Sequence, residues 1–479
     1  LRLRKELQLD LSLRDFFTAQ TVAGIATHCG QSDAIAVTTT ITPQDPRAQY
    51  PLSSAQTRLF AIQSADPANT AYNVVGGMII EGALDRTTLA GAFVDLIARH
   101  EILRTRFGTQ SGSPYQVVDP APHAFDLPLL DMSAAPEAEI ITLALAGEFA
   151  HVFDLSHGPL LRASLGELAK DRWLLVINLH HIVSDGWSVP IMISDLSSYY
   201  QARLDKDTAE LSPLNIQYRD YACWQHEVEH DNAAVARACD HLSGYLKAAE
   251  PTTTFHADLP RQPQRKGHGA MARRGVSAQD SAALRGHLAT QGSTLFSASA
   301  AALHMLLRLR GIGDDDAPTI IGTADAGRDA METEDQIGFY LNLLPHVMCL
   351  PASAANDTCT AQSTVETAAM LGNKSAPFEQ VIDRIGLDPE PGHTPLFDVL
   401  LIVQSNAQPV QTVGPHKAVF LPDETCTCRY DLNIMVEDRD AIEVLIEYDT
   451  ALYTAATVDA LLDEFLTLLV AALTDPTAT

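Results

Sequence analysis

Long apolar runs and basic residues are both scarce in this 479-residue chain. No apolar run is long enough to cross a bilayer, and residues 1–20 are charged rather than signal-like, so we expect neither a membrane span nor a leader peptide. Lysine and arginine number 32 against 60 acidic residues, which gives a net charge of −28. This balance argues against nucleic acid and anionic membranes as partners, since both bind through positive patches.

A cysteine framework and a phosphate-binding glycine loop are also missing. The seven cysteines are scattered, as expected for free thiols in a reducing cytoplasm, and we expect a cytoplasmic protein. Cys426 and Cys428 could form half of a zinc site, but no second pair lies at zinc spacing. Three aspartates follow Gly311-Ile312-Gly313 and would repel phosphate. We therefore expect no bound metal and no ATP-dependent activation by this chain itself.

The chain is too long for one ordinary domain, and its pattern is α/β. Residues 1–28 predict a small helical unit, and the polar, proline-bearing stretch 29–49 predicts a linker. From Tyr50 onward, strand-like and helix-like segments alternate to the end, as in two α/β lobes. We expect strands at 73–80, 173–179, 318–322, 397–404 and 441–448, and helices at 87–100, 297–309 and 456–472.

The most informative segment is HHIVSDGWS, which runs from His180 to Ser188. It follows the apolar run 173–179, which predicts a buried strand, and it precedes a segment of helical spacing that Ser188 can cap. Two histidines, an aspartate and a glycine thus share a tight loop on a rigid scaffold, where reactive side chains are often placed. A metal site would use His180, His181 and Asp185, but nothing nearby supplies a further ligand at a recognisable spacing.

The spacing His181-x-x-x-Asp185-Gly186 resembles the HHxxxDG signature of condensation domains from nonribosomal peptide synthetases. The resemblance extends across nearly all of residues 50–475, where further motifs follow in the family's order. Departures occur at residues 324–325, 343–346 and 392–394, and they concern substrate and acceptor details rather than the fold. The matching motifs cover residues 51–59, 99–107, 153–162, 218–224, 337–342, 377–379 and 395–397.

The resemblance implies an α/β fold with two chloramphenicol acetyltransferase-like lobes in a V-shaped pseudo-dimer, plus a small N-terminal helical fragment. We place the N-terminal lobe at 50–224 and the C-terminal lobe at 225–479, joined to the fragment by the linker 29–49. Residues 1–28 are similar to the C-terminal part of a peptidyl carrier domain. In that family, the serine that bears phosphopantetheine would lie upstream of this segment.

The implied reaction is attack of a carrier-bound acceptor amine on a carrier-bound donor thioester, which forms an amide and frees a thiol. His181, with an ordinary pKa near 6.5, is suited to take the amine's proton or to hydrogen-bond the amine, and both roles stay open. We expect His180 to be structural and hydrogen-bonded, because consecutive residues leaving a strand point in opposite directions. Gly186 is expected to give backbone freedom and to bring an N–H close to an oxyanion.

The family's aspartate pairs with an arginine and holds the loop, so Asp185 is expected to be structural. We expect Arg104 to be its partner, with Arg99 and Arg106 as weaker candidates.

The resemblance also implies partners. These are an upstream donor carrier and downstream acceptor carrier and adenylation domains, whose phosphopantetheine arms enter a shared tunnel; no cofactor is bound directly. Ser184 fits HHxxSDGWS, which is typical of members that accept an L-configured donor, so we expect an L-configured donor and acceptor.

Several related functions compete with amide formation. An epimerisation domain usually continues DGVSWR, whereas this chain reads DGWSV. A heterocyclisation domain replaces the histidines with aspartates, and a non-catalytic docking module for a partner protein tends to lose the motif. Ester formation with a hydroxyl acceptor remains open.

Overall fold

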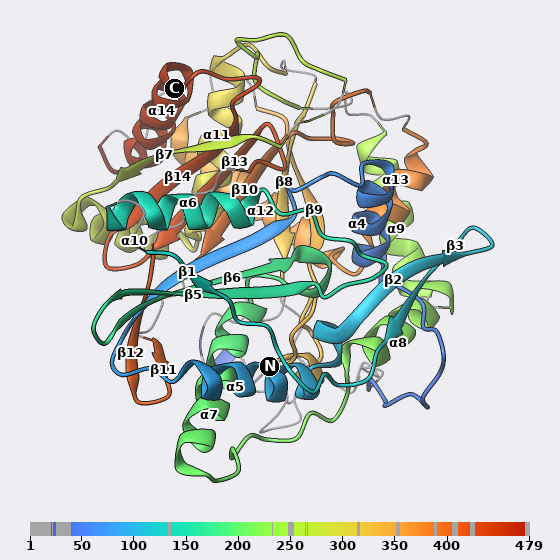
Figure 1. Cartoon of the computed structure of the whole chain (residues 1–479). Coiled ribbons are helices and arrows are strands. Elements are labelled where there is room, and N and C mark those ends of the chain that lie inside the picture. Colours follow the sequence, from blue (N-terminus) through green and yellow to red (C-terminus); the bar gives the residue numbers. More distant parts are fainter. Residues whose placement is uncertain are drawn as a thin grey trace.

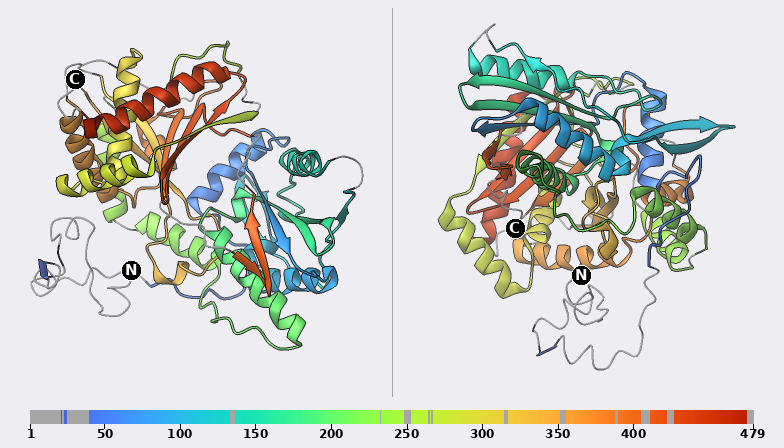
Figure 2. Two further views of the ribbon diagram at one scale, coloured as in Figure 1. Left: turned by 90° about the vertical axis from the view of Figure 1, so that its left-hand side faces the viewer. Right: turned by 60° about the horizontal axis from the view of Figure 1, so that its bottom comes forward.

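The computed structural model consists of two α/β lobes, each built on a six-stranded sheet (Figure 2). The carrier-like segment 1–28 lies outside the described residues except for Thr21, Ala23 and Gly24. The other described residues are 40–132, 136–231, 233–247, 253–263, 265, 267–313, 317–350, 355–387, 390–404, 411–421 and 427–474.

The first sheet has helices on both faces (Figure 1). Its strand order is β11-β12-β1-β6-β5-β4, with α6 on one face and α5 and α7 on the other. In β6, Leu175 and Ile177 pack toward α5 and α7, whereas Leu174 and Val176 pack toward α6. Burial on both faces explains why this strand is a continuous apolar run. The bounds are β1 Asn73–Glu81, α5 Arg86–Arg99, β4 Leu129–Leu130, α6 Glu137–Phe149, β5 Leu161–Ala169, β6 Arg172–His180, α7 Ser188–Asp205, β11 Gln411–Val413 and β12 His416–Phe420.

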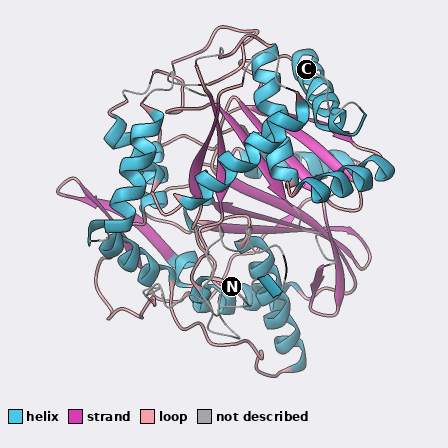
Figure 3. Ribbon diagram, turned by 180° about the vertical axis from the view of Figure 1, so that it is seen from behind, coloured by secondary structure: helices cyan, strands magenta, loops and turns pink. Residues whose placement is uncertain are grey.

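The second sheet is mixed and is likewise covered on both faces (Figure 3). Its strand order is β7-β14-β13-β10-β8-β9. Within β8, Ile321 faces the cluster formed with α10, α11 and α14, while Ile320 faces the cluster formed with α9 and α13. The bounds are α9 Ala233–Leu246, β7 Gly269–Gly275, α10 Ala278–Gln291, α11 Leu295–Leu309, β8 Thr319–Asp325, β9 Asn342–Met348, α12 Asn356–Gly372, α13 Phe378–Ile385, β10 Val399–Gln404, β13 Leu432–Asp438, β14 Ile442–Asp449 and α14 Ala455–Thr474.

The remaining elements are short or lie where the lobes meet. The predicted lobe boundary at residue 224 falls inside α8. The expected C-terminal lobe also donates residues 411–420 to the first sheet, where Ala418 of β12 lies opposite Ile80 of β1. The chain therefore crosses between the lobes more than once. These elements are α4 Ser54–Ala65, η1 Glu101–Arg104, β2 Thr105–Gln110, β3 Ser113–Val118, η2 His181–Val183, α8 Tyr218–Asp231 and η3 Met331–Thr333.

The α/β fold class and all eight segments expected from the sequence are confirmed. Each segment is an element of the expected type whose ends differ by a few residues. Long, strongly patterned segments are the most predictable part of a chain, and their ends are the least predictable.

Two histidines form a buried hydrogen-bonded pair inside the second lobe. Nε2 of His304 on α11 lies 3.1 Å from Nδ1 of His346 on β9. Nδ1 of His304 lies 2.5 Å from the hydroxyl oxygen of Thr319, and Nε2 of His346 lies 3.2 Å from the hydroxyl oxygen of Thr367. Burial lowers the pKa of His346 to about 4 and holds that of His304 well below its ordinary value. Both rings are therefore neutral near pH 7.

This pair predicts a loss of stability in mild acid. The pKa of His346 is lower in the folded than in the unfolded chain, so its contribution is complete above about pH 6.5 and decreases as the pH falls toward 4. We expect His346 alone to remove about 1 kcal/mol of unfolding free energy by pH 5.5. Urea unfolding at pH 7.5 and 5.5 measures this change. His346→Gln should reduce the difference between the two pH values. An equal difference in His346→Gln and the wild type would contradict the assignment.

Candidate active site

The histidine loop lies at the end of β6, where the first sheet meets the second lobe. His180 is the last residue of β6 and lies opposite Asn73 of β1. The chain then makes the single turn η2, and α7 begins at Ser188. From α4, the Nε2 amide of Gln56 donates to the carbonyl of Ile182 at 3.2 Å. The loop is therefore held by β6 before it, by α7 after it and by the side chain of Gln56 in α4.

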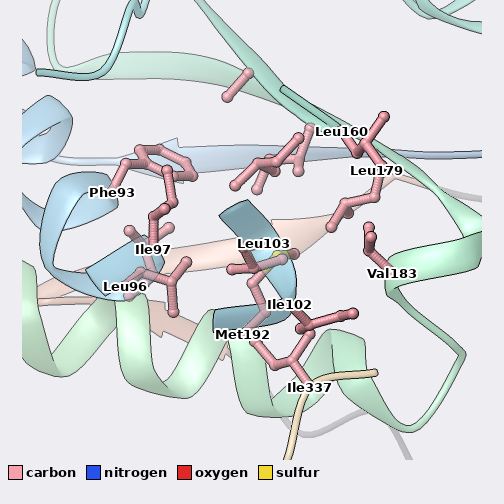
Figure 4. Close-up of a cluster of buried hydrophobic side chains, with 14 of the residues drawn as sticks. Phe93, Leu96, Ile97, Ile102, Leu103, Leu160, Leu179, Val183, Met192 and Ile337 are labelled. Carbon is pink, nitrogen blue, oxygen red and sulfur yellow. The ribbon is translucent and has the colours of Figure 1, made fainter. Parts of the chain in front are cut away.

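Apolar packing supports the loop from within the first lobe (Figure 4). Leu179 and Val183 flank the histidines and join the cluster that contains Met192 of α7. Ile337, which precedes β9, belongs to the same cluster. The loop is thus anchored in a core to which both lobes contribute.

His180 has the features expected of a structural residue. It is 1% exposed, and its Nδ1 nitrogen accepts the N–H of Ile182 at 3.1 Å. Its Nε2 nitrogen lies 3.4 Å from the side-chain oxygen of Gln63, and its ring meets that of Phe153 edge-on. Burial, assisted by the charge of Arg429, lowers the pKa of His180 to about 3.

His181 is held through its backbone, which leaves its ring largely uncommitted. Its N–H donates to the carbonyl of Tyr72 at 2.8 Å. The ring is edge-on to Phe339 with centroids 4.9 Å apart, and its buried Nδ1 nitrogen has no hydrogen-bond partner in the described part of the chain. Burial first, and the charge of Arg429 second, lower the pKa of His181 well below its ordinary value. A neutral imidazole can accept a hydrogen bond or a proton from an amine.

Asp185 pairs with an arginine, but the partner is Arg328. Nη2 of Arg328 lies 3.0 Å from Oδ1 and 3.2 Å from Oδ2 of Asp185, and both side chains are almost completely buried. The N–H and hydroxyl of Ser188 and the N–H of Tyr340 also donate to this carboxylate. Because Arg328 follows β8 in the second lobe, the ion pair joins the lobes directly beneath the histidine loop.

The prediction that Arg104 pairs with Asp185 is therefore wrong, and so are the two weaker candidates. Arg104 instead donates to the carbonyl of Asp119 and lies 3.5 Å from Glu101. Arg99 pairs with Asp195, and Arg106 pairs with Asp119. All three face partners elsewhere in the first lobe.

Gly186 is exposed, and its conformation does not require glycine. Its φ is not in the left-handed region, so the observed conformation leaves the expected backbone freedom a prediction. A Cβ built there meets no other atom within 4 Å. Open space beside this peptide is compatible with the approach of a ligand to the loop, which keeps the oxyanion role as a proposal.

No group of three histidine, cysteine or acidic side chains among the described residues could hold a metal ion. No helix among those residues is long and apolar enough to cross a membrane. A hollow of about 340 Å³ lies beside α7, apart from His181, and it is lined by Arg99, Pro190, Ile191, Ser194, Asp195, Leu211, Ser212 and Asp335.

A family model described as "Condensation domain" matches residues 47–479. The chain is 33% identical over 477 residues to CymA, a probable nonribosomal peptide synthetase of Salinispora arenicola (strain CNS-205). It is 31% identical over 484 residues to tyrocidine synthase 2 of Brevibacillus parabrevis. These matches cover 97% and 99% of the chain but only 6% and 13% of the two relatives.

Solved structures share the fold at low sequence identity. The X-domain from teicoplanin biosynthesis superposes with a TM-score of 0.83 at 23% identity, over 91% of this chain and 98% of that one. The first condensation domain of the calcium-dependent antibiotic synthetase gives a TM-score of 0.76 at 19% identity, over 91% and 98% of the two chains.

Proposed function

This chain belongs to the condensation domain family, and from that premise we propose that it forms an amide bond between two carrier-bound substrates. An acceptor amine attacks the carbonyl carbon of a donor thioester, the C–N bond forms, and the donor's thiol leaves. The observation that carries the proposal is the state of His181, whose ring is neutral and uncommitted in a loop that both lobes hold.

In this proposal, each residue of the histidine loop has its own role. The thioester is already activated, so the main task of the protein is to position the two substrates. A free α-amine has a pKa of about 7.7–8 and must lose a proton before or during attack. His181 takes that proton or accepts a hydrogen bond from the amine, and the N–H of Gly186 faces the oxyanion. His180, Asp185 and Arg328 maintain the shape of the loop.

A docking module without catalysis is the second candidate. The likeness to the teicoplanin X-domain, which has also been solved in complex with OxyB, favours it. At 22% and 23% identity that likeness concerns the fold alone. Since docking modules tend to lose the histidine motif and this chain keeps it whole, amide formation is the better-supported proposal.

The partners we propose are an upstream donor carrier and downstream acceptor carrier and adenylation domains in one cytoplasmic assembly, with phosphopantetheine arms that enter from the carriers. Residues 1–28 are proposed to be the end of the donor carrier. A modifiable serine upstream of residue 1 would support this, and its absence would contradict it.

We expect a preference for a donor that ends in an L-configured residue. Ser184 is 1% exposed, and its N–H donates to the carbonyl of His181 at 3.2 Å, so it acts by shaping the loop rather than by touching the donor. The test incubates the chain with an aminoacyl acceptor carrier and donor carriers that bear L- or D-ended peptides, followed by mass spectrometry of the acceptor arm.

A faster initial rate with the L-ended donor would support both the reaction and its stereochemistry. A faster rate with the D-ended donor would reverse the stereochemical assignment alone. No extension of any amine acceptor would exclude amide formation, and transfer to a hydroxyl acceptor in its place would identify an ester-forming domain.

A further inference from the structure

We propose that Arg429, a residue of the second lobe, is a positioning residue of this active site. It holds the backbone segment on which His181 rests. Its catalytic meaning rests on the proposed function, but its effect on His181 does not.

Arg429 and His181 hold two consecutive peptide units just before β1. Nε of Arg429 donates to the carbonyl of Ala71 at 3.0 Å, and the N–H of His181 donates to the carbonyl of Tyr72 at 2.8 Å. The guanidinium carbon of Arg429 lies 5.8 Å from the centre of the Tyr72 ring. A change at residue 429 is therefore transmitted to His181 through one short stretch of backbone.

The main chain at Arg429 is itself rigidly held. Nη1 of Arg265 donates to the carbonyl of Arg429 at 3.2 Å. Arg265 in turn pairs with Asp398 and Asp431, two carboxylates that are fully buried. Ion pairs in the interior of the second lobe thus fix the position from which Arg429 reaches the first lobe.

The charge of Arg429 is not neutralised by a carboxylate within ion-pair distance in the part of the chain that the structure describes. Arg429 and His180 are the charged or titratable side chains that affect the pKa of His181. Because burial keeps His180 neutral near pH 7, Arg429 is the one of these two side chains that carries a positive charge. A nearby cation disfavours the imidazolium, so it preserves the form of His181 that can accept from an amine.

The Asp185–Arg328 ion pair and Arg429 therefore act on the histidine loop in different ways. The ion pair of Asp185 and Arg328 determines where the loop lies, because it joins Asp185 of the loop to the second lobe. Arg429 instead holds the peptide unit next to the one that the N–H of His181 binds.

The test compares Arg429→Gln with Arg429→Lys in the full chain. Histidine-labelled protein is compared by NMR at pH 7.5, and the His181 signal is assigned by its absence in His181→Ala. We expect the His181 signal to move in R429Q, because the backbone segment that binds it loses a hydrogen bond, and to stay in place in R429K. With loaded carriers, kcat should fall about tenfold to a hundredfold in R429Q with little change in KM, and R429K should recover most of the loss.

An identical His181 signal in R429Q and the wild type would overturn the effect of Arg429 on His181, whatever the activity. Equal activity loss in R429Q and R429K would overturn the positioning role. If R429Q does not fold, Arg429→Met, which keeps the apolar stem against Tyr72, tests the same loss of charge. A wild-type chain without condensation activity would refute the proposed function, while the NMR comparison would still decide the effect of Arg429.

Discussion

His181→Ala is expected to lower the rate of condensation by about 10²- to 10⁴-fold while leaving the fold intact, the range typical of losing a positioned base. The loop should keep its shape because the N–H of His181, not its ring, binds the Tyr72 carbonyl. The substitution removes the edge-on contact of the ring with Phe339, and no hydrogen bond to Nδ1 is lost among the described residues. Single-turnover extension of the acceptor arm, combined with thermal melting, measures both effects.

His180→Ala is the matched control, one residue away in the same loop. It removes the acceptor for the Ile182 N–H and leaves that donor buried, so we expect it to cost about 1–3 kcal/mol of stability. His181→Ala should therefore lose activity, whereas His180→Ala should lose stability. Wild-type activity in a folded His181→Ala protein would remove His181 from the mechanism.

The sequence was sufficient to predict several of the helices and strands and the place of the histidine loop. The run 173–179 is apolar at every position but one, and α6 on one side and α5 and α7 on the other explain that pattern. The helical spacing after Ser188 likewise predicted α7. Such periodic patterns reflect burial, which is largely a local property of each segment.

The contacts between lobes could not be predicted in this way. Arg104 was the expected partner of Asp185, but the pair forms with Arg328, 143 positions from Asp185. Nothing in the local pattern of either residue encodes this contact. The departures from the family at residues 324–325 lie in the same stretch as Arg328, but they do not indicate this pairing. The pairing of β12 with β1 could not be predicted for the same reason.

Asp185→Ala is expected to destabilise the chain by about 3–5 kcal/mol, because it leaves the Arg328 charge buried without its counter-ion. Arg328 would retain the carbonyls of Thr333 and Gln336, the hydroxyl oxygen of Ser188 and the faces of the Tyr340 and Trp187 rings, but no carboxylate. Arg328→Met should be less harmful, since the carboxylate keeps the two donors of Ser188 and the N–H of Tyr340. Urea unfolding of both variants, followed by far-UV circular dichroism, measures these losses.

The double variant distinguishes a true pair from two independent losses. Asp185→Ala combined with Arg328→Met removes both charges, so the combined loss should fall short of the sum by about 0.5–3 kcal/mol. Arg104→Met serves as the control, because Arg104 is a half-buried arginine that binds Asp119 and Glu101 rather than Asp185. Its loss should add to that of Asp185→Ala without coupling. Coupling of Asp185 to Arg104 and not to Arg328 would contradict the pairing, while coupling to Arg328 would place the link between the lobes directly under the loop that carries His181.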